Sequence, residues 1–250
     1  MKKITVYFLV SVFLFVSMLS AEDNSKQKWQ SLFNGKNLDG WIPVLEYELK
    51  TVESKKTESK KIDTEKNNVT KNRNEKNNIK KKPNVRVENG VIVINSIAGM
   101  EGMKYVRKFP QCDYEICFEA KRIEGSDFFA AITFPVGKDF CTFVNGGWGG
   151  STIGLSCIDG IDASENESFD MYTFNDNEWY KFRIIVTKSK IEIWITGKDG
   201  EKKSEEKQVV NLEYKNRKIS LREETVSYKP LGFAAWYSTG NLKNIKFRLR

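Results

Sequence analysis

The chain has 250 residues, of which 40% are hydrophobic and 12% aromatic, and its formal net charge is +8. It contains no histidine, so histidine-dependent nucleophilic chemistry and zinc sites built on histidine are excluded. The excess of Lys and Arg falls largely between Glu46 and Pro83 and the rest is close to neutral, so we expect no basic groove and no nucleic-acid partner.

Residues 1–21 have the three-part layout of a secretory signal. Lys2 and Lys3 are followed by an apolar run from Ile4 to Met18 and then by the small pair Ser20-Ala21. This run is shorter than the roughly 20 apolar residues that a membrane span requires, and no second such segment follows. We therefore expect cleavage near Ala21, export to the periplasm or the extracellular space, and no membrane span in the mature chain.

Residues 22–250 are expected to form a single domain that carries one inserted loop, and we expect a monomer. The insertion, residues 49–82, is almost entirely Lys, Asn, Glu, Ser and Thr with no sustained hydrophobic period. Such a composition predicts disorder. An alternative role for the insertion is a basic tether for an acidic surface polymer.

Beyond Pro83 the sequence is a series of short strand signals separated by turn residues, with Asn89-Gly90 predicting a hairpin turn of the primed type. The alternation over 114–121 predicts a half-buried strand whose apolar face begins at Tyr114 and whose other face is polar. The same period over 179–186 and 191–196 predicts a hairpin across Thr187–Lys190. Further strands are predicted at 128–134, 140–144, 152–158, 231–237 and 242–249.

These elements predict an all-β antiparallel sandwich with no helix of useful length. The last predicted strand, 242–249, keeps one basic face, as edge strands often do. A closing strand in such a position more often returns beside the N-terminal strands, which favours a jelly roll over a simple meander.

The densest local signal is Asn145-Gly146-Gly147-Trp148-Gly149-Gly150 between two predicted strands. Glycines here let the backbone adopt positive φ and approach a ligand closely. An exposed Trp148 would offer a flat apolar face for stacking on a sugar ring. Alternatively, the segment is a tight hairpin whose tryptophan folds back onto the core.

The loop that follows the strand ending near Ile158 carries Asp159, Asp162 and Glu165. Bunched carboxylates suit a hard cation such as calcium, or hydrogen bonds to sugar hydroxyls, although the spacing does not match an EF-hand. Asx turns explain the same residues without a ligand. No cofactor is certain from the sequence, and a divalent cation stays an alternative.

Several charged residues project from the polar faces of the predicted strands, among them Glu115, Glu119 and Arg183. Trp194 projects from the same faces. They line a groove if the sheet face is concave and form a solvated surface if it is convex. Arg122 falls at the end of an apolar face, where a charge needs a partner, and it marks a candidate site rim.

Four cysteines, Cys112, Cys117, Cys141 and Cys157, are present in a chain that we expect to be exported. They are either small buried hydrophobes or include one bridge, such as Cys141 to Cys157.

The segment Leu32-Phe33-Asn34-Gly35-Lys36-Asn37-Leu38-Asp39-Gly40-Trp41 resembles the opening of the 3-keto-disaccharide hydrolase domain, long known as a domain of unknown function. The likeness continues through the Val87–Gly90 turn, the strand from Asp113 to Arg122, Trp179-Tyr180 and the closing Asn244-Ile245-Lys246. The glycine-tryptophan run and the acidic loop resemble an exported bacterial subgroup, often planctomycete.

This resemblance implies a concanavalin A-like lectin/glucanase jelly roll and, in active members, cleavage of a glycoside oxidised at C3. The keto group acidifies the proton at C2, so a base can remove it and the glycosidic bond leaves by elimination. We expect Glu119 as the base and Arg122 as the oxyanion partner. The chain departs from the family at Gly125–Phe129 and at Trp236–Gly240, which bears on activity.

The favoured function is therefore a carbohydrate-active exported hydrolase or lyase that acts on 3-keto-disaccharides. The alternative is a non-catalytic carbohydrate-binding module, which needs only exposed aromatic and polar loop residues around a shallow groove. A structural surface protein that relies on the insertion ranks third. The candidate substrate-binding residues are Asn145, Trp148, Asp159, Asp162, Glu165, Trp194 and Tyr237.

Overall fold

A computed structural model describes residues 28–44, 84–199 and 202–250. The predicted secretory signal, residues 1–21, and the predicted insertion, residues 49–82, lie outside the described residues. Within the described parts of the chain, no helix is both long and apolar enough to cross a membrane.

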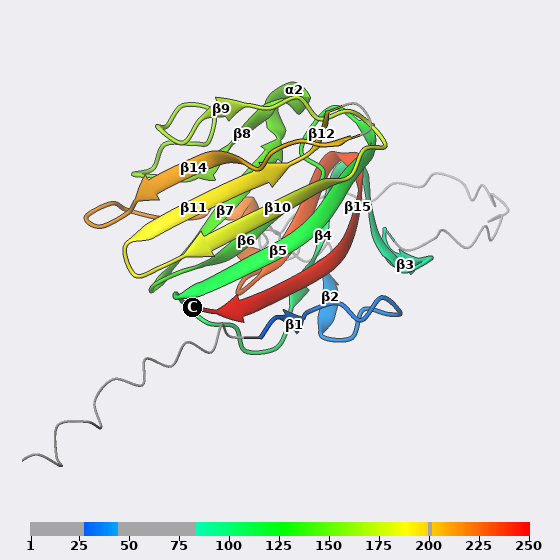
Figure 1. Cartoon of the computed structure of the whole chain (residues 1–250), viewed down its shortest axis with the longest axis horizontal. Helices are drawn as coiled ribbons and strands as arrows, with labels where there is room; N and C mark the ends of the chain where they lie inside the picture. The colour runs from blue at the N-terminus through cyan, green and yellow to red at the C-terminus, as the bar shows by residue number, and fades with distance from the viewer. Residues whose placement is uncertain (1–27, 45–83, 200–201) are drawn as a thin grey trace, which may run out of the picture.

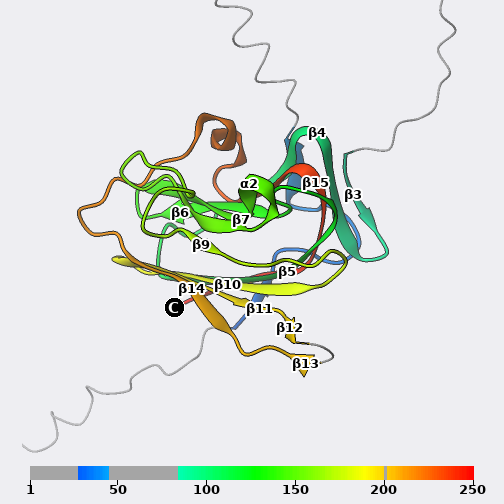
Figure 2. The ribbon, with the colours of Figure 1, turned by 90° about the horizontal axis from the view of Figure 1, so that it is seen from above.

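The described residues form an antiparallel β-sandwich, which confirms the predicted all-β, concanavalin A-like fold (Figures 1 and 2). The strands hydrogen-bond in the order β14-β11-β10-β5-β15-β6-β7-β8-β9. One layer holds β5 (Tyr114–Gly125), β10 (Tyr180–Val186), β11 (Lys190–Thr196) and β14 (Lys207–Glu213). The other layer holds β6 (Ala131–Val136), β7 (Asp139–Gly146), β8 (Thr152–Ser156) and β9 (Asp170–Met171).

A single strand, β15 (Gly232–Leu249), joins the two layers. Its first residues, 232–234, pair with β6, and residues 238–249 pair with β5. Between them Tyr237 has a φ of 44°, and the pairing register with β4 (Val91–Tyr105) shifts at this point. The residues predicted as strands at 231–237 and 242–249 are therefore strand, but the predicted break between them is wrong: a bulge redirects the strand without ending it.

The closing strand also returns beside the N-terminal strands, as predicted. Residues Lys246 and Phe247 of β15 pair with β1 (Gln30–Ser31). With β5 on its other side, this part of β15 is not an edge strand, contrary to the interpretation of its basic face. Two further strands, β2 (Trp41–Val44) and β3 (Val85–Glu88), pair with β4.

The remaining elements are short. A small ribbon pairs β12 (Lys198–Asp199) with β13 (Lys202–Lys203), and the helical segments are α2 (Gly147–Gly150) and the 3₁₀ turn η1 (Glu223–Tyr228). The predicted primed turn is confirmed, because Asn89 and Gly90 have φ values of 50° and 77°.

The core lies between the layers, and strand alternation places its side chains there. Tyr114, Ile116 and Phe118 of β5 are buried, and the Phe118 ring stacks on Phe182 of β10 with centroids 4.9 Å apart. The opposite face of β5 is less open than predicted, because Glu115 is only 2% exposed. Arg248 covers it, donating to the Glu115 carboxylate at 2.8 Å and 2.6 Å.

All four cysteines are free thiols, so the bridge considered between Cys141 and Cys157 is not formed. Cys117 and Cys141 are buried, and burial raises the pKa of Cys117 to about 11. They behave as small hydrophobic side chains, which was the other prediction for them.

Candidate functional site

A cavity of about 230 Å³ opens at the layer of β6, β7 and β8, with η1 contributing to its wall. In Figure 2, α2 and the coil of η1 lie on the side of this layer that faces away from β10 and β11. We call the cavity the Asp127 pocket. Its lining includes the aromatic Phe128, Trp148 and Trp236, the charged Asp127, Asp162, Arg222 and Glu224, and the hydroxyl-bearing Thr142, Ser156 and Thr225.

Asp127 lies in the connection from β5 to β6, and the bulge of β15 holds it there. The Asp127 backbone N–H donates to the Ser238 hydroxyl at 3.0 Å, and that hydroxyl donates to the Asp127 carbonyl at 2.8 Å. Gly125, with a φ of 107°, allows the close approach, since a Cβ there would lie 2.3 Å from the Tyr237 carbonyl oxygen. The β15 bulge and the β5–β6 connection therefore fix one residue together.

The Asp127 carboxylate is half-buried. It accepts the backbone N–H of Phe128 at 2.8 Å and that of Trp148. Burial raises the pKa of Asp127 above its ordinary value, although the two hydrogen bonds act in the opposite direction. Among the described residues no Lys or Arg forms an ion pair with it. This carboxylate is consequently a better base than an ordinary aspartate.

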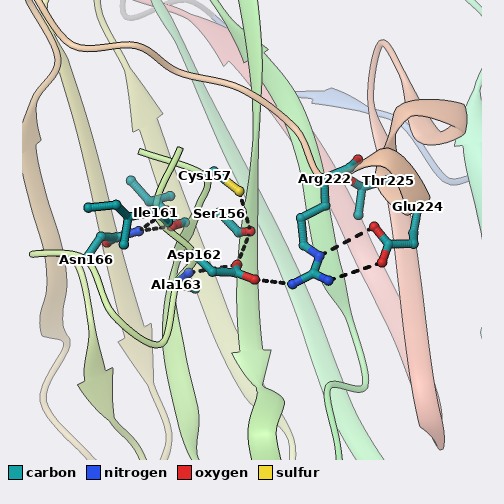
Figure 3. A network of polar contacts seen from close by, with 10 residues as sticks. Ser156, Cys157, Ile161, Asp162, Ala163, Asn166, Arg222, Glu224 and Thr225 are labelled. Atoms are coloured by element: carbon teal, nitrogen blue, oxygen red, sulfur yellow. Dashed lines mark hydrogen bonds and ion pairs between the residues drawn. The ribbon is translucent and has the colours of Figure 1, made fainter. Parts of the chain in front are cut away.

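Arg222 lies across the pocket from β8 and joins two carboxylates, as Figure 3 shows. Its Nη1 donates to Asp162, while Nη2 and Nε donate to the two oxygens of Glu224 at 3.2 Å and 3.4 Å. Asp162 also accepts the Ser156 hydroxyl and the Ala163 N–H. The network thus ties η1 to the end of β8.

The hydrogen bonds of this network favour the charged forms of Asp162, Glu224 and Arg222. Burial acts to raise the pKa of Asp162, but hydrogen bonds from Ser156, Ala163 and Arg222 outweigh it and the pKa lies below its usual value. For Glu224, burial is again outweighed, mainly by Arg222, and the pKa is lowered. The pKa of Arg222 is raised, with the Glu224 hydrogen bond as the largest cause. Two carboxylates therefore share one guanidinium charge.

The aromatic side chains give the pocket its apolar walls. Trp148 is 47% exposed and stands in α2 with a φ of 48°, next to Gly149 with a φ of 95°. Trp236 and Phe128 pack against the small cluster of Val44, Met100, Tyr228 and Ala234. Flat rings beside hydrogen-bonding groups suit a sugar, whose ring has an apolar face and a polar rim.

The structure brings only some of the predicted binding residues together. Trp148 and Asp162 line the pocket. Asn145 is buried and hydrogen-bonds both the N–H and the carbonyl of Ala130, so it links β7 to the start of β6. Asp159 lies outside the pocket and accepts from Arg217 at 2.6 Å and from the Lys218 N–H at 2.7 Å.

The other predicted binding residues also lie outside the pocket lining. Glu165 is exposed in the loop after β8. Trp194 of β11 lies under the Arg183 guanidinium, 3.8 Å from its ring centroid, in the opposite layer. Tyr237 is 50% exposed and meets the edge of Trp236, 5.0 Å between centroids, so it is adjacent to the pocket without lining it.

The predicted catalytic pair, Glu119 and Arg122, does not line the pocket. Glu119 of β5 pairs with Lys243 at 3.4 Å and accepts from Asn244 at 2.8 Å, in a separate cavity that Trp29 and Lys181 also line. Arg122 has the partner that the pattern required: it donates to Asp176 at 2.5 Å. It also donates to the carbonyls of Phe174 at 2.7 Å and Gly150 at 3.3 Å, next to the turn that bears Trp148.

Sequence reasoning missed Asp127, Arg222, Glu224 and Trp236 as pocket residues. Asp127 and Trp236 fell within two segments noted only as departures from the family pattern. Arg222 and Glu224 had no such signal, because the 221–225 segment follows neither strand nor helix periodicity. In the parts of the chain that the structure describes, no group of three or more His, Cys, Asp or Glu is placed to hold a metal ion.

A comparison with protein families finds one whose model matches this chain. Residues 28–248 match the 3-keto-alpha-glucoside-1,2-lyase-like domain. The chain belongs to this family. The predicted resemblance is therefore confirmed at the level of the family, and the chain carries a carbohydrate-active domain. A search of the curated proteins found no match.

Several solved structures are similar to this chain at low sequence identity. A candidate glycosyl hydrolase from Parabacteroides distasonis is 14% identical, with 93% of this chain and 98% of that chain covered and a TM-score of 0.47. A seed lectin from Lotus tetragonolobus is 10% identical, with 67% and 91% covered and a TM-score of 0.44. A β-1,3-glucanase from Mycobacterium marinum is 9% identical, with 67% and 77% covered and a TM-score of 0.38.

Proposed function

We propose that this protein is an enzyme that cleaves 3-keto-glycosides by elimination and that the Asp127 pocket is its active site. The observation that carries the proposal is that one pocket holds two groups. The first is a half-buried carboxylate that pairs with no cation in the described parts of the chain, and the second is a guanidinium held in place by two other carboxylates. The first group suits proton removal and the second suits stabilisation of an oxyanion.

In the proposed reaction, the Asp127 carboxylate removes the proton at C2 of the keto sugar. The electron pair of the C2–H bond first moves toward the C3 carbonyl, which becomes an enolate. It then forms the C1=C2 double bond as the bond from C1 to the glycosidic oxygen breaks. The departing oxygen takes a proton from water, and the products are an unsaturated keto sugar and the free alcohol.

Arg222 is the proposed partner of the enolate oxygen. A guanidinium has five N–H groups, and the three contacts to Asp162 and Glu224 use three of them. Two N–H groups remain for a substrate oxygen. Because its two carboxylates fix the plane of the guanidinium, little reorganisation is needed when charge develops on the substrate.

The first prediction concerns the base. Asp127→Asn keeps a backbone N–H acceptor but cannot take a proton, so we expect release of the alcohol from a 3-keto-glucoside to fall by roughly 100-fold or more. In the unchanged protein, the rate should fall as the pH drops through the pKa of Asp127, which burial places above the ordinary aspartate value. Both are measured by following alcohol release over a pH series.

Glu119→Gln is the matched control, because it removes a carboxylate outside the pocket. Its rate should stay near that of the unchanged protein, and the unoxidised glucoside should release nothing. Assays with and without added calcium test the divalent cation prediction in the same experiment. Full activity in Asp127→Asn, or loss in Glu119→Gln alone, would contradict the assignment.

A second candidate function is a non-catalytic carbohydrate-binding module, and the exposure of Trp148 beside Trp236 favours it. Stacking on these rings requires no base. In this case no alcohol would be released from the keto substrate, while calorimetry would detect binding of a sugar that disappears in Trp148→Ala.

A further inference from the structure

The charges that line the Asp127 pocket are unbalanced. Its lining includes three carboxylates, those of Asp127, Asp162 and Glu224, and one guanidinium, that of Arg222. With all four groups ionised, the lining carries a net negative charge. The proposed reaction uses Asp127 as the base and uses Asp162 and Glu224 to hold Arg222, but the net negative charge remains and bears on which ligands can bind.

The positive charge of Arg222 is already paired with two carboxylates. Arg222 donates to Asp162 on one side and to both oxygens of Glu224 on the other. An anionic ligand near Arg222 would therefore meet the field of two carboxylates as well as that of the guanidinium. Two N–H groups can still reach a substrate oxygen, and an enolate formed there adds no net charge to the pocket, because Asp127 has taken up the proton and is neutral. A ligand carboxylate, in contrast, adds a permanent negative charge beside Asp162 and Glu224, and their repulsion disfavours its binding.

Asp127 presents the opposite situation. Its carboxylate accepts two backbone N–H groups, and no cation among the described residues pairs with it. Phe128 follows Asp127 in sequence, and Trp148 lies close enough to donate its backbone N–H to the Asp127 carboxylate. A positively charged ligand group at this point would meet both a carboxylate and aromatic rings, and each of these attracts a cation.

We propose that the Asp127 pocket selects sugars by charge: it takes a ring that bears a free ammonium group, an unacylated amino sugar, in preference to a neutral ring, and it rejects a ring that bears a carboxylate. The inference rests on the proposed function only in requiring that the pocket binds a sugar.

The test measures binding by calorimetry, with the protein at neutral pH and moderate salt, for the methyl glycosides of glucosamine, glucose and glucuronic acid. We expect the glucosaminide to bind roughly tenfold more tightly than the glucoside, which is the order of one partly buried charge interaction. The glucuronide should bind more weakly than the glucoside by a similar factor. Added salt should narrow both differences.

Two variants locate the effect within the pocket. In Asp127→Asn, the advantage of the glucosaminide over the glucoside should disappear. In Glu224→Gln, Arg222 loses one of its two carboxylate partners, so the affinity for the glucuronide should approach or exceed the affinity for the glucoside. Glu119→Gln, outside the pocket, should leave the order of all three unchanged. Circular dichroism shows whether each variant is folded. If Asp127→Asn does not fold, the change in glucuronide affinity in Glu224→Gln tests the proposal.

The outcomes separate this inference from the proposed function. Binding of the glucoside with equal binding of the other two sugars would overturn charge selection and leave the elimination proposal standing. Release of alcohol from a keto substrate with the predicted order of affinities supports both. If none of the three sugars binds and no keto substrate is cleaved, the pocket is not a sugar site and both proposals fail.

Discussion

At the scale of single residues, Arg122 acts on the pocket through a neighbour. Its guanidinium holds the carbonyls of Phe174 and Gly150 and the carboxylate of Asp176, and its side chain is only 12% exposed. Gly150 ends the turn that presents Trp148. We therefore assign Arg122 a positioning role, in which it fixes the turn that carries the stacking ring.

Arg122→Lys tests this role, because lysine keeps the charge but lacks the planar fork that reaches three acceptors. We expect the free energy of unfolding to fall by about 1–2 kcal/mol and the affinity for sugar to weaken. Urea unfolding and calorimetry measure the two effects. Arg107→Lys is the control, since its pairing with Asp39 is exposed and its replacement should change neither quantity. An unchanged stability in Arg122→Lys would remove the positioning role.

The pocket could be predicted in part from single residues. Trp148 was found because glycines on both sides mark an exposed turn, and Asp162 because carboxylates cluster around it. Asp127 and Arg222 could not be found in this way. They lie far apart in sequence and come to one pocket through tertiary contacts, among them the bond of Asp127 to Ser238 in the β15 bulge and the ion pair of Arg222 with Asp162. Local spacing carries no record of such tertiary contacts.

At the scale of elements, β15 passes so close to the β5–β6 connection that one position tolerates only glycine. A Cβ on Gly240 would lie 1.8 Å from the Phe129 carbonyl oxygen, which is backbone and cannot turn aside. We expect Gly240→Ala to cost about 3 kcal/mol in the free energy of unfolding. Because this contact is near Asp127, sugar binding should weaken as well.

Gly35→Ala is the comparison for that measurement. Gly35 has a φ of 73°, but a Cβ there would meet nothing within 4 Å. Its replacement should therefore cost only the conformational penalty of about 1 kcal/mol. Urea unfolding of both variants separates steric conflict from backbone strain. Equal costs would mean that β15 shifts away from Phe129 to accommodate the methyl group.

Element positions were predictable where alternation is regular. The hairpin of β10 and β11 lies where the period of two placed it, with Phe182, Ile184 and Ile193 buried. The continuity of β15 as one strand was not predictable, because Tyr237-Ser238-Thr239-Gly240 has the composition of a turn although it stays in the sheet. Hydrogen bonds to β4 and β5 on both sides override that local preference.

At the scale of the whole molecule, the surface carboxylates make the fold sensitive to acid. Among the carboxylates that the structure describes, six have lowered pKa values: Asp159, Asp162, Glu167, Asp170, Glu206 and Glu224. A lowered folded-state pKa contributes stability above the unfolded value, and this stability is lost as the pH falls through the folded value. Asp127 acts in the opposite sense, because its raised pKa favours the folded state at low pH.

Because six lowered pKa values oppose one raised pKa, the thermal midpoint should be steady near neutral pH and fall below about pH 5, where the carboxylates of the unfolded chain begin to bind protons. Thermal unfolding followed by circular dichroism between pH 7 and pH 2.5 measures it. Arg217→Gln removes the partner of Asp159 and Glu167 and should make the acid-side decline shallower. A midpoint that rises on acidification would show that Asp127 outweighs the other six.

The strand that joins the two layers also dictates when the sandwich can close during synthesis. A ribosome makes β1, β4, β5 and β6 before any residue of β15 exists, yet all four pair with β15. Until residues 232–249 emerge, these strands have unpaired edges, and the apolar faces meant for the core are incompletely covered. The nascent chain is thus expected to stay loosely structured and in need of chaperone protection for as long as β15 is missing.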